Sequence, residues 1–503
     1  MCWRKYLMWF ANEHVQFRLP EIESLLSVFN IQYNWIHQEI SHPFWVIELP
    51  SEHAATQIAS RSVSLHCCVE LWAQAKTEEE LHRKLRVLPA EQFQLHFSAE
   101  KSFRIKVDTF CNKLSQADKI SKIENFSYLP IEGHVNLKDP DVCLNIIEFY
   151  GLDSNNIPKK PLDLYFGRWV ANGQRDLLAK LSLKTRKFIG NTSMDPQLSI
   201  LMANQAKIVD GDLVLDPFVG SGSLLVAAAH FGGYVLGTDI DYLMLHGRTR
   251  PSRIQSKKQR EKDESVWANM EQYGMSGKYL DVVIADSSLP IWHDSLTLDA
   301  IITDPPYGIR EATERIGSTK SYTISEEHLE THIPSKIEYG LQHMYMDLLQ
   351  FAVYHLRVGG RLVCWVPIIR ENYCEEKLPS HPCLKLVYNC EQVLSSYTSR
   401  RLITLEKTYE PDELQQGTAS ETSAREFRAK FFKYGEEKQS RATSVPNQIF
   451  RENGLFVMLG SRAMSHLCKQ QDSDRPYSST NSVKCLGLLA TSYPPSHLLE
   501  SGD

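Results

Sequence analysis

The chain has 503 residues, of which 42% are hydrophobic and 23% are charged, and both fractions are ordinary for a globular protein. Because this length exceeds what one hydrophobic core usually serves, two or three domains are expected. The formal net charge of −6 argues against a uniformly basic nucleic-acid-binding protein. A basic surface for nucleic acid would have to be local or be supplied by a partner.

The cysteines and the apolar segments indicate a compartment. The eleven cysteines contain no Cys-x-x-Cys pair, so they match neither a disulfide framework nor a zinc site, and no metal is expected. A reduced, cytoplasmic location fits this pattern. No apolar run approaches the roughly 20 residues that a membrane span needs, so no membrane association is expected. The apolar segment Met1–Phe10 is interrupted by Arg4 and Lys5 and does not resemble a signal peptide.

The first 172 residues alternate between strand-like and helix-like segments. Pro20 suits the first turn of a helix whose apolar face is Ile22, Leu25, Leu26 and Phe29. Ser102–Phe110 alternates with period two, which predicts a half-exposed strand with basic residues on its solvent face. Further strands are predicted at Phe44–Leu49, Cys143–Tyr150 and Leu162–Val170, and a charged helix at Glu78–Arg86. These elements predict an N-terminal α/β subdomain at residues 1–60 and a second small domain at 61–172.

A basic stretch at residues 173–190 separates this region from the rest. It carries Lys184, Arg186 and Lys187, which could follow a phosphate backbone and are the candidate RNA contacts. A solvated linker or helix face is the alternative. The segment Thr192-Ser193-Met194-Asp195-Pro196 then has the residues that begin a helix, which continues from Leu198 to Ala206.

Four apolar strands in the second half each lead into an aspartate. They are Leu213–Asp216, Tyr234–Asp239, Leu280–Ala285 followed by Asp286, and Ala300–Thr303 followed by Asp304. Because parallel strands deliver their carboxyl ends to one edge of a sheet, the four carboxylates are expected to share a ligand-binding rim. After Asp216 comes Phe218 and then Gly220 and Gly222, glycines that let the backbone approach a ligand. Asp239 lies 23 positions after Asp216, close to the spacing of about 20 for a carboxylate that binds a ribose.

The most specific motif is Asp304-Pro305-Pro306-Tyr307. Two prolines end the strand and hold Asp304 and Tyr307 on a stiff turn. The Asp304 carboxylate and the Pro305 carbonyl could accept both N–H groups of a nucleobase amine and free its delocalised lone pair for attack. Tyr307 offers a flat face on which an extruded base could stack. The alternative is a loop that only ends a strand and makes a turn.

The remaining segments are less specific. The basic run Arg248–Lys262 could contact RNA or only be solvated, and Ile309–Tyr339 is expected to be a lid or a substrate loop. His343–Leu356 is predicted to be helical, and Arg361–Val366 a strand. From Glu410 onward the chain is polar and mostly expected to be disordered, with a helix expected at Glu426–Tyr434.

Asp216-Pro-Phe-Val-Gly-Ser-Gly together with Asp304-Pro-Pro-Tyr resembles the motif pair of class I methyltransferases that methylate amino nitrogens from S-adenosylmethionine. The sequence around them, including Leu183–Pro196, resembles the catalytic subunits of eukaryotic tRNA guanosine-10 N2-methyltransferases. This resemblance covers roughly Phe10 to Lys407, which is most of the chain. The resemblance implies an α/β fold: a Rossmann-like, seven-stranded methyltransferase domain at 191–408, preceded by an α+β region with a THUMP-like RNA-binding domain. Leu384–Leu394 and Leu402–Lys407 would then be the final hairpin of the sheet, and 409–503 a largely disordered tail.

The resemblance also implies residue roles. Asp216, Phe218, Gly220 and Gly222 would line the methionine side of S-adenosylmethionine, Asp239 its ribose and Asp286 its adenine, with Thr192 and Ser193 in the segment over the donor. Asp304 and Pro305 would position the amine, with Pro306 in the same turn and Tyr307 stacked on the base. The expected partners are tRNA and a small zinc-containing activator subunit. Two other hypotheses stay open: an amino-methyltransferase that acts on adenine in DNA or another RNA, and an inactive RNA-binding subunit.

Overall fold

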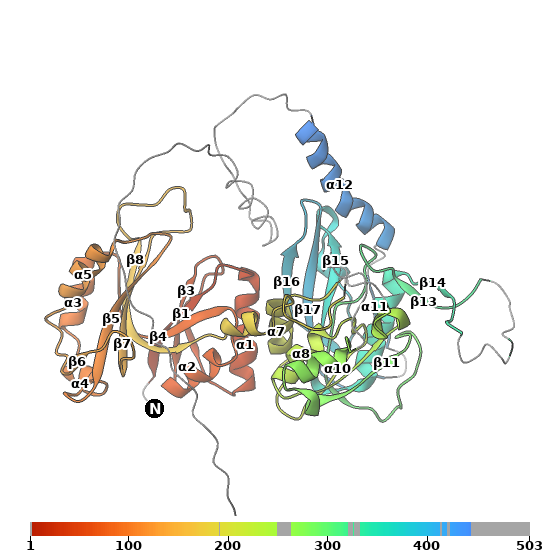
Figure 1. The fold of residues 1–503 in the computed structure, drawn as a ribbon, viewed down its shortest axis with the longest axis horizontal. Coiled ribbons are helices and arrows are strands. Elements are labelled where there is room, and N and C mark those ends of the chain that lie inside the picture. The colour runs from red at the N-terminus through yellow and green to blue at the C-terminus, as the bar shows by residue number, and fades with distance from the viewer. Residues whose placement is uncertain are drawn as a thin grey trace, which may run out of the picture. The chain divides into compact units, whose positions relative to one another are not determined.

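In the computed structural model, residues 3–190, 192–248, 263–319, 325, 332–412, 415–419 and 423–443 are described, and the side chains of 434–443 are not. The N-terminal part of the described chain builds one eight-stranded sheet in the order β2-β3-β1-β4-β8-β7-β5-β6 (Figure 1). Its strands are β1 Arg4–Phe10, β2 Asn34–His37, β3 Phe44–Leu49, β4 Leu65–Ala75, β5 Ser102–Phe110, β6 His134–Val135, β7 Val142–Phe149 and β8 Asp163–Asn172. The boundary predicted at residues 60 and 61 falls between α2 and β4 of this one sheet.

Short helices accompany the N-terminal sheet. They are α1 Arg18–Val28, α2 Glu52–Ala59, α3 Glu78–Arg86, α4 Ala90–Gln94 and α5 Gln116–Glu124. The start of α2 illustrates the local rules, because the Ser51 side chain accepts a hydrogen bond from the Ala54 backbone N–H at 3.2 Å and caps the helix. Three apolar clusters form on this sheet: one around Trp72, Phe93 and Phe166, one around α1 and α2, and one made by strand residues such as Phe44 and Tyr165.

The second sheet has seven strands in the order β11-β10-β9-β12-β15-β17-β16, which confirms the predicted methyltransferase sheet with its final hairpin. The strands are β9 Leu213–Asp216, β10 Tyr234–Asp239, β11 Tyr279–Ile284, β12 Leu298–Thr303, β15 Leu356–Ile369, β16 Leu384–Val393 and β17 Thr398–Lys407. The first five strands in this order are parallel, and β17 is antiparallel to both of its neighbours. The carboxyl ends of β9, β10, β11 and β12 therefore lie at the same edge of the sheet.

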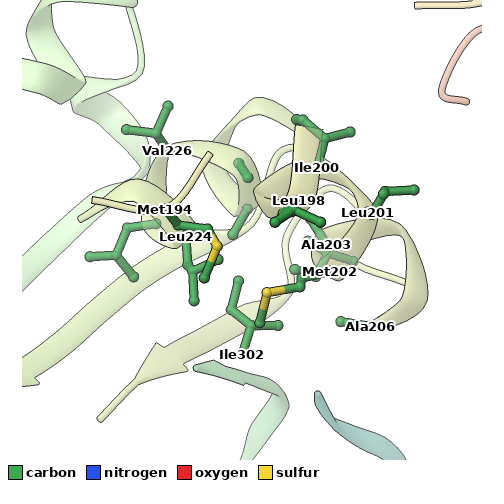
Figure 2. Packing of buried hydrophobic residues seen from close by; sticks show 14 of the residues in the cluster. Met194, Leu198, Ile200, Leu201, Met202, Ala203, Ala206, Leu224, Val226 and Ile302 are labelled. Carbon is green, nitrogen blue, oxygen red and sulfur yellow. The ribbon is translucent and has the colours of Figure 1, made fainter. Parts of the chain in front are cut away.

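Helices cover both faces of the second sheet. α7 Pro196–Gln205 and α8 Ser223–His230 contribute to one apolar cluster, and α11 Leu341–His355 contributes to the other. Figure 2 shows part of the first cluster, with Met194, Met202 and Leu224 close to Ile302 of β12. The remaining helices are α6 Asp176–Lys180, α9 Tyr242–Leu245, α10 Val266–Gln272 and α12 Ala424–Thr443, and a small hairpin pairs β13 Glu314–Ile316 with β14 Lys336–Glu338. Among the described helices, none combines the length and the apolar character that crossing a membrane would require.

A buried polar seam joins the N-terminal sheet to the second sheet. The Glu21 carboxylate on α1 accepts hydrogen bonds from the Ser62 hydroxyl at 2.8 Å, from the Val63 N–H at 2.9 Å and from the Ser64 N–H at 3.1 Å. It also accepts one from the Asn204 amide of α7 at 2.9 Å. Every residue of α7 is buried, because one side of the helix faces the second sheet and another contacts α1.

Candidate active site

The strand registers bring three of the four predicted aspartates to one rim. Asp216 pairs with Gly237 of β10, two residues before Asp239, while Leu215 pairs with Ile301 of β12, three residues before Asp304. The Thr303 hydroxyl donates a hydrogen bond of 2.7 Å to Oδ1 of Asp216 and so joins the ends of β9 and β12 directly. The rim that strand-end aspartates predict is therefore present.

The loop between β9 and α8 makes a cradle beside Asp216 and Asp239. Gly220 and Gly222 have φ values of +51° and +74°, which residues other than glycine rarely adopt. A Cβ on Gly220 would face open space. The Gly220 N–H donates to Oδ2 of Asp239 at 2.8 Å, and the Phe218 N–H donates to Oδ1 of Asp216 at 3.1 Å. The two carboxylates thus fix the loop while its glycine backbone stays open for a ligand.

The charge of this cradle favours a cationic ligand. Burial raises the pKa of Asp216 to about 7, and burial also raises the pKa of Asp239. Within the described residues, no ion pair involves Asp216 or Asp239. A ligand that carries a sulfonium and an ammonium group would supply the missing positive charge, so the residues present fit S-adenosylmethionine.

Asp286 lies at the end of β11 and is 2% exposed. Its Oδ1 accepts from the Ser288 N–H at 2.9 Å, and its Oδ2 accepts from the Ile316 N–H of β13 at 2.6 Å. Both oxygens therefore fix local backbone, and Asp286 attaches the small hairpin to the end of β11. The predicted contact of Asp286 with adenine stays a prediction.

The segment that contains Thr192 and Ser193 bridges the cradle and the Asp304 loop. The Ser193 hydroxyl lies 2.6 Å from the Ser221 hydroxyl of the cradle and accepts from the Gly190 N–H at 2.8 Å. The Thr192 hydroxyl donates to Glu311, four residues after Tyr307, at 3.3 Å. This placement is compatible with the predicted position of the segment over the methyl donor.

The Asp304 carboxylate is held asymmetrically. Its Oδ2 forms an ion pair of 3.0 Å with the Arg400 guanidinium of β17, while its Oδ1 is buried and has no hydrogen-bond partner among the described residues. Burial raises the pKa of Asp304, and Arg400 opposes this shift. A buried acceptor without a partner is costly, so Oδ1 is the one atom of this loop that most needs a donor from outside the chain.

Tyr307 lies three residues further along the same loop, after Pro305, which is buried, and Pro306, which is half-buried. Its hydroxyl lies 3.4 Å from the Arg400 guanidinium, and burial raises its pKa to about 12. Its ring meets the ring of Phe427 of α12 edge to face, with the ring centres 5.7 Å apart. The Asp304–Tyr307 loop is thus fixed by β17 on one side and contacted by the C-terminal helix on another.

Sequence reasoning missed two parts of this site. Arg400 was missed because the last strand was predicted to begin at Leu402, whereas β17 begins at Thr398. The helix expected at Glu426–Tyr434 is confirmed within α12, but nothing in the sequence indicates that Ala424 and Phe427 contact Gly308 and Tyr307. The spacing of Phe427 and Phe431 could have suggested an apolar helix face.

The predicted RNA contacts are only partly on the surface. Lys184 and Lys187 are exposed, but Arg186 is buried. The Arg186 guanidinium donates to the Ser223 hydroxyl at 2.8 Å, to the Leu181 carbonyl at 3.0 Å and to the Tyr273 hydroxyl at 3.3 Å. These internal contacts correct the expectation for Arg186, because its charge faces the protein interior. Most of the other basic run, residues 249–262, lies outside the described residues.

Comparisons with known proteins match both parts of the chain to known families. Residues 4–175 match the family "Tmrp11 THUMP N-terminal domain", and residues 184–327 match "RMKL-like, methyltransferase domain". The tRNA (guanine(10)-N(2))-methyltransferase TRMT11 of Mus musculus is 48% identical over 81% of this chain and 88% of its own length. The Dictyostelium discoideum protein of the same name is 34% identical over 81% of this chain and 82% of its own length. The solved structure of TrmN from Thermus thermophilus is 18% identical and covers 80% of this chain and 99% of its own, with a TM-score of 0.39 that is too low to inform the site.

Both of these relatives are more than 30% identical to this chain, and each match covers more than two thirds of this chain and of the relative. The chain therefore belongs to the family of S-adenosylmethionine-dependent tRNA (guanine(10)-N(2))-methyltransferases, with an N-terminal THUMP domain.

Proposed function

We propose that this chain transfers a methyl group from S-adenosylmethionine to the exocyclic N2 amine of guanine 10 in tRNA, with Asp304 and the Pro305 carbonyl as the groups that hold the amine. When bound, the donor supplies an electrophilic methyl group on a sulfonium. The observation that carries the assignment is the buried, unpartnered Oδ1 of Asp304 on the same rim as Asp216 and Asp239.

The amine of guanine is a weak nucleophile because its lone pair is delocalised into the ring. Asp304 Oδ1 and the Pro305 carbonyl would each accept one N–H bond, which would fix the nitrogen and turn its lone pair toward the donor. This is catalysis by positioning, since the sulfonium is already a good leaving group. Pro305 and Pro306 contribute by restricting the turn that carries both acceptors.

Tyr307 would stack on the guanine after the base leaves the helical stem. Flipping a paired base out costs roughly a few kcal/mol, which stacking in the site has to offset. The Tyr307 ring is held through its hydroxyl near Arg400, and its edge-to-face contact with Phe427 keeps an aromatic wall beside it. Lys184 and Lys187 are exposed near the segment that leads to Ser193 and would contact the phosphate backbone of the tRNA.

The donor would lie across the glycine cradle. Asp216, Phe218, Gly220 and Gly222 would surround its methionine portion, with the open backbone of Gly220 as the closest approach. Asp239 would bind the ribose and Asp286 the adenine end. Thr192 and Ser193 would cover the donor, since they connect the cradle at Ser221 to the loop at Glu311.

A transfer assay with tritiated donor tests the proposal. The substrates are one tRNA with guanosine at position 10 and the same tRNA with inosine there, which differs only by lacking the N2 amine. The proposal predicts methyl transfer to the guanosine form and none to the inosine form. Equal labelling of both forms, or labelling of adenine in DNA instead of tRNA, would overturn the proposal.

We further propose that a small activator subunit covers the free edge of β11. This strand ends the sheet, and its Leu280, Val283 and Ile284 are 52%, 41% and 40% exposed. An exposed apolar edge strand promotes aggregation unless a partner covers it, and an added strand from another chain is a common solution. The half-exposed Trp267 of α10, whose ring lies 5.5 Å from that of Tyr279, extends the apolar surface beside the edge.

Co-expression with the activator tests this surface. The double substitution Leu280→Lys and Val283→Lys should abolish co-purification of the activator and reduce tRNA methylation, because charges replace the apolar edge. Leu137→Lys, at an apolar residue of the N-terminal part that is 72% exposed, is the control and should retain both. Undiminished co-purification of the double variant would remove β11 as the docking surface.

A further inference from the structure

Arg400 lies on β17, the antiparallel strand that no donor-binding motif includes, yet its side chain reaches the Asp304 loop. The residue is 8% exposed. Its guanidinium forms the 3.0 Å ion pair with Asp304 Oδ2 and lies 3.4 Å from the Tyr307 hydroxyl. One buried cation thus contacts both side chains that the proposed function assigns to the target base.

The guanidinium is itself fixed from several sides. Its Nε donates to the Gln392 side chain of β16 at 2.7 Å, and one of its terminal nitrogens lies 3.7 Å from the Met194 sulfur. The guanidinium carbon lies 4.0 Å above the Trp365 ring of β15. Because the planar group is both stacked and hydrogen-bonded, it has one orientation relative to the loop.

A purely structural role does not explain this arrangement well. Burying an arginine and a carboxylate together is costly, and apolar residues of similar size commonly give equal or higher stability. The pair also leaves the other oxygen of Asp304 without a partner, which a stability device would avoid. A role in the reaction would explain why the chain keeps this buried pair in spite of its free-energy cost.

We propose that Arg400 is a positioning residue, which keeps Asp304 ionised and turns its Oδ1 toward the amine of the target base. The inference rests on the proposed function, since it assumes that Asp304 accepts the amine N–H. Oδ2 is occupied by Arg400, so only Oδ1 is left for the substrate. The same guanidinium steadies the Tyr307 hydroxyl, so the acceptor and the stacking ring keep a fixed relation.

The surrounding groups explain why a cation is needed. Asp304 interacts electrostatically with the Asp216 carboxylate of β9, with Tyr307 of its own loop, with Tyr345 of α11 and with Cys364 of β15. None of these groups carries a positive charge, and Asp216 is itself an acid. Arg400 of β17 is the group that lowers the pKa of Asp304 against the effect of burial.

The sign of the pH effect follows from these neighbours. Asp304 accepts a hydrogen bond on both oxygens only when it is ionised, so activity should fall as the pH drops through its pKa. Loss of Arg400 would raise that pKa further and move the acidic limb of the rate profile toward higher pH. A merely structural arginine would lower the rate by the same factor at every pH.

The test uses the full chain with its activator, guanosine-10 tRNA and saturating donor, and measures single-turnover methyl transfer as a function of pH. Arg400→Gln should move the acidic limb upward by about one pH unit or more and lower the rate on that limb by about tenfold per unit. Arg400→Lys keeps the charge and should show a smaller shift. Donor affinity should change less than about twofold in both variants, because neither touches the cradle.

Arg401→Gln is the matched control. Arg401 is the next residue of β17, and its guanidinium lies 3.7 Å from the Glu391 carboxylate and 4.0 Å from the Tyr373 ring. Within the described residues it has no hydrogen bond or ion pair with the Asp304 loop. This variant should leave the acidic limb where it is in the wild type. If Arg400→Gln does not fold, Arg400→Met, which also removes the charge, decides: an unshifted limb with a lowered rate overturns the inference.

The proposed function and the positioning role of Arg400 can be contradicted separately. If the wild-type complex does not distinguish guanosine from inosine at position 10, the proposed function is wrong. If the wild type does distinguish them and Arg400→Gln lowers the rate equally at all pH values, the proposed function stands and Arg400 has no positioning role.

Discussion

Two buried polar regions of this chain differ in how completely their groups are paired. In the seam between the two sheets, the Glu21 carboxylate accepts four hydrogen bonds, and the Asn204 amide is engaged by Glu21 and Arg61. At the rim of the second sheet, Oδ1 of Asp304 is buried without a partner, and Asp216 and Asp239 have no ion pair within the described residues. Both regions contain a buried carboxylate, but Glu21 accepts hydrogen bonds on both of its oxygens, whereas Asp304 accepts on one only.

The difference indicates what each region is for. Saturated buried groups contribute to one fixed arrangement of the chain, because any movement would break several bonds at once. At the rim, the unpartnered Oδ1 of Asp304 can accept a hydrogen bond from a ligand, and a cationic ligand can pair with Asp216 and Asp239. Burial raises the pKa of all three carboxylates. The contrast predicts that mutations in the seam affect stability, whereas mutations at the rim affect binding and rate.

The largest stability effect is expected from Glu21→Ala. Its removal leaves four donors without their acceptor in a buried place, which should lower the free energy of unfolding by about 3 kcal/mol or more. Chemical denaturation measures the change. Glu23→Ala on the same helix, which loses one hydrogen bond to Tyr388, is the control and should cost about 1 kcal/mol. Equal costs for the two variants would contradict the saturated seam.

An intermediate effect is expected at Asp216. Its pKa of about 7 means that much of the population is protonated at neutral pH, and a cationic donor favours the ionised form. Donor binding should therefore release a proton, and affinity should weaken by about tenfold per unit as the pH falls below that pKa. Calorimetry in two buffers of different ionisation enthalpy measures the released proton. Asp216→Asn should abolish the release, and a wild type that exchanges no proton would show that the cradle is not charged as described.

The smallest effect is expected on the exposed surface. The double substitution Lys184→Gln and Lys187→Gln should weaken tRNA binding modestly and reduce the slope of affinity against salt concentration by about 2. The control is the double substitution Lys377→Gln and Lys385→Gln. These two lysines are also exposed, and they follow the Asp304–Tyr307 motif in the sequence. An unchanged slope in the first pair would remove this segment from the RNA surface.

The sequence could predict the rim because its signals are local. Each of Asp216, Asp239, Asp286 and Asp304 directly ends an apolar strand, and a parallel sheet brings such ends together whatever the rest of the chain does. The seven-stranded sheet and its final hairpin were predictable from the family resemblance. The three carboxylates that meet at the rim therefore needed no tertiary information to be found, while the role of Asp286 stays a prediction.

The remaining features depend on contacts between distant residues. Arg400 and Asp304 are brought together by the position of β17 beside β15, which no local pattern encodes. Arg186 was wrongly expected on the surface because a basic run gives charge but not burial, and its partners Ser223 and Tyr273 lie on other elements. The contact of Phe427 with Tyr307 was equally invisible, since the polar composition of the tail gives no reason to expect it beside the Asp304–Tyr307 loop.

In the proposed reaction, the unpaired oxygen of Asp304 holds the target amine while other residues hold the donor. Single-turnover methyl transfer by Asp304→Ala, measured beside donor binding by calorimetry, tests this claim most directly. The account predicts that transfer to guanosine-10 tRNA is abolished while the donor binds nearly as in the wild type. Transfer at a comparable rate in the variant would contradict it.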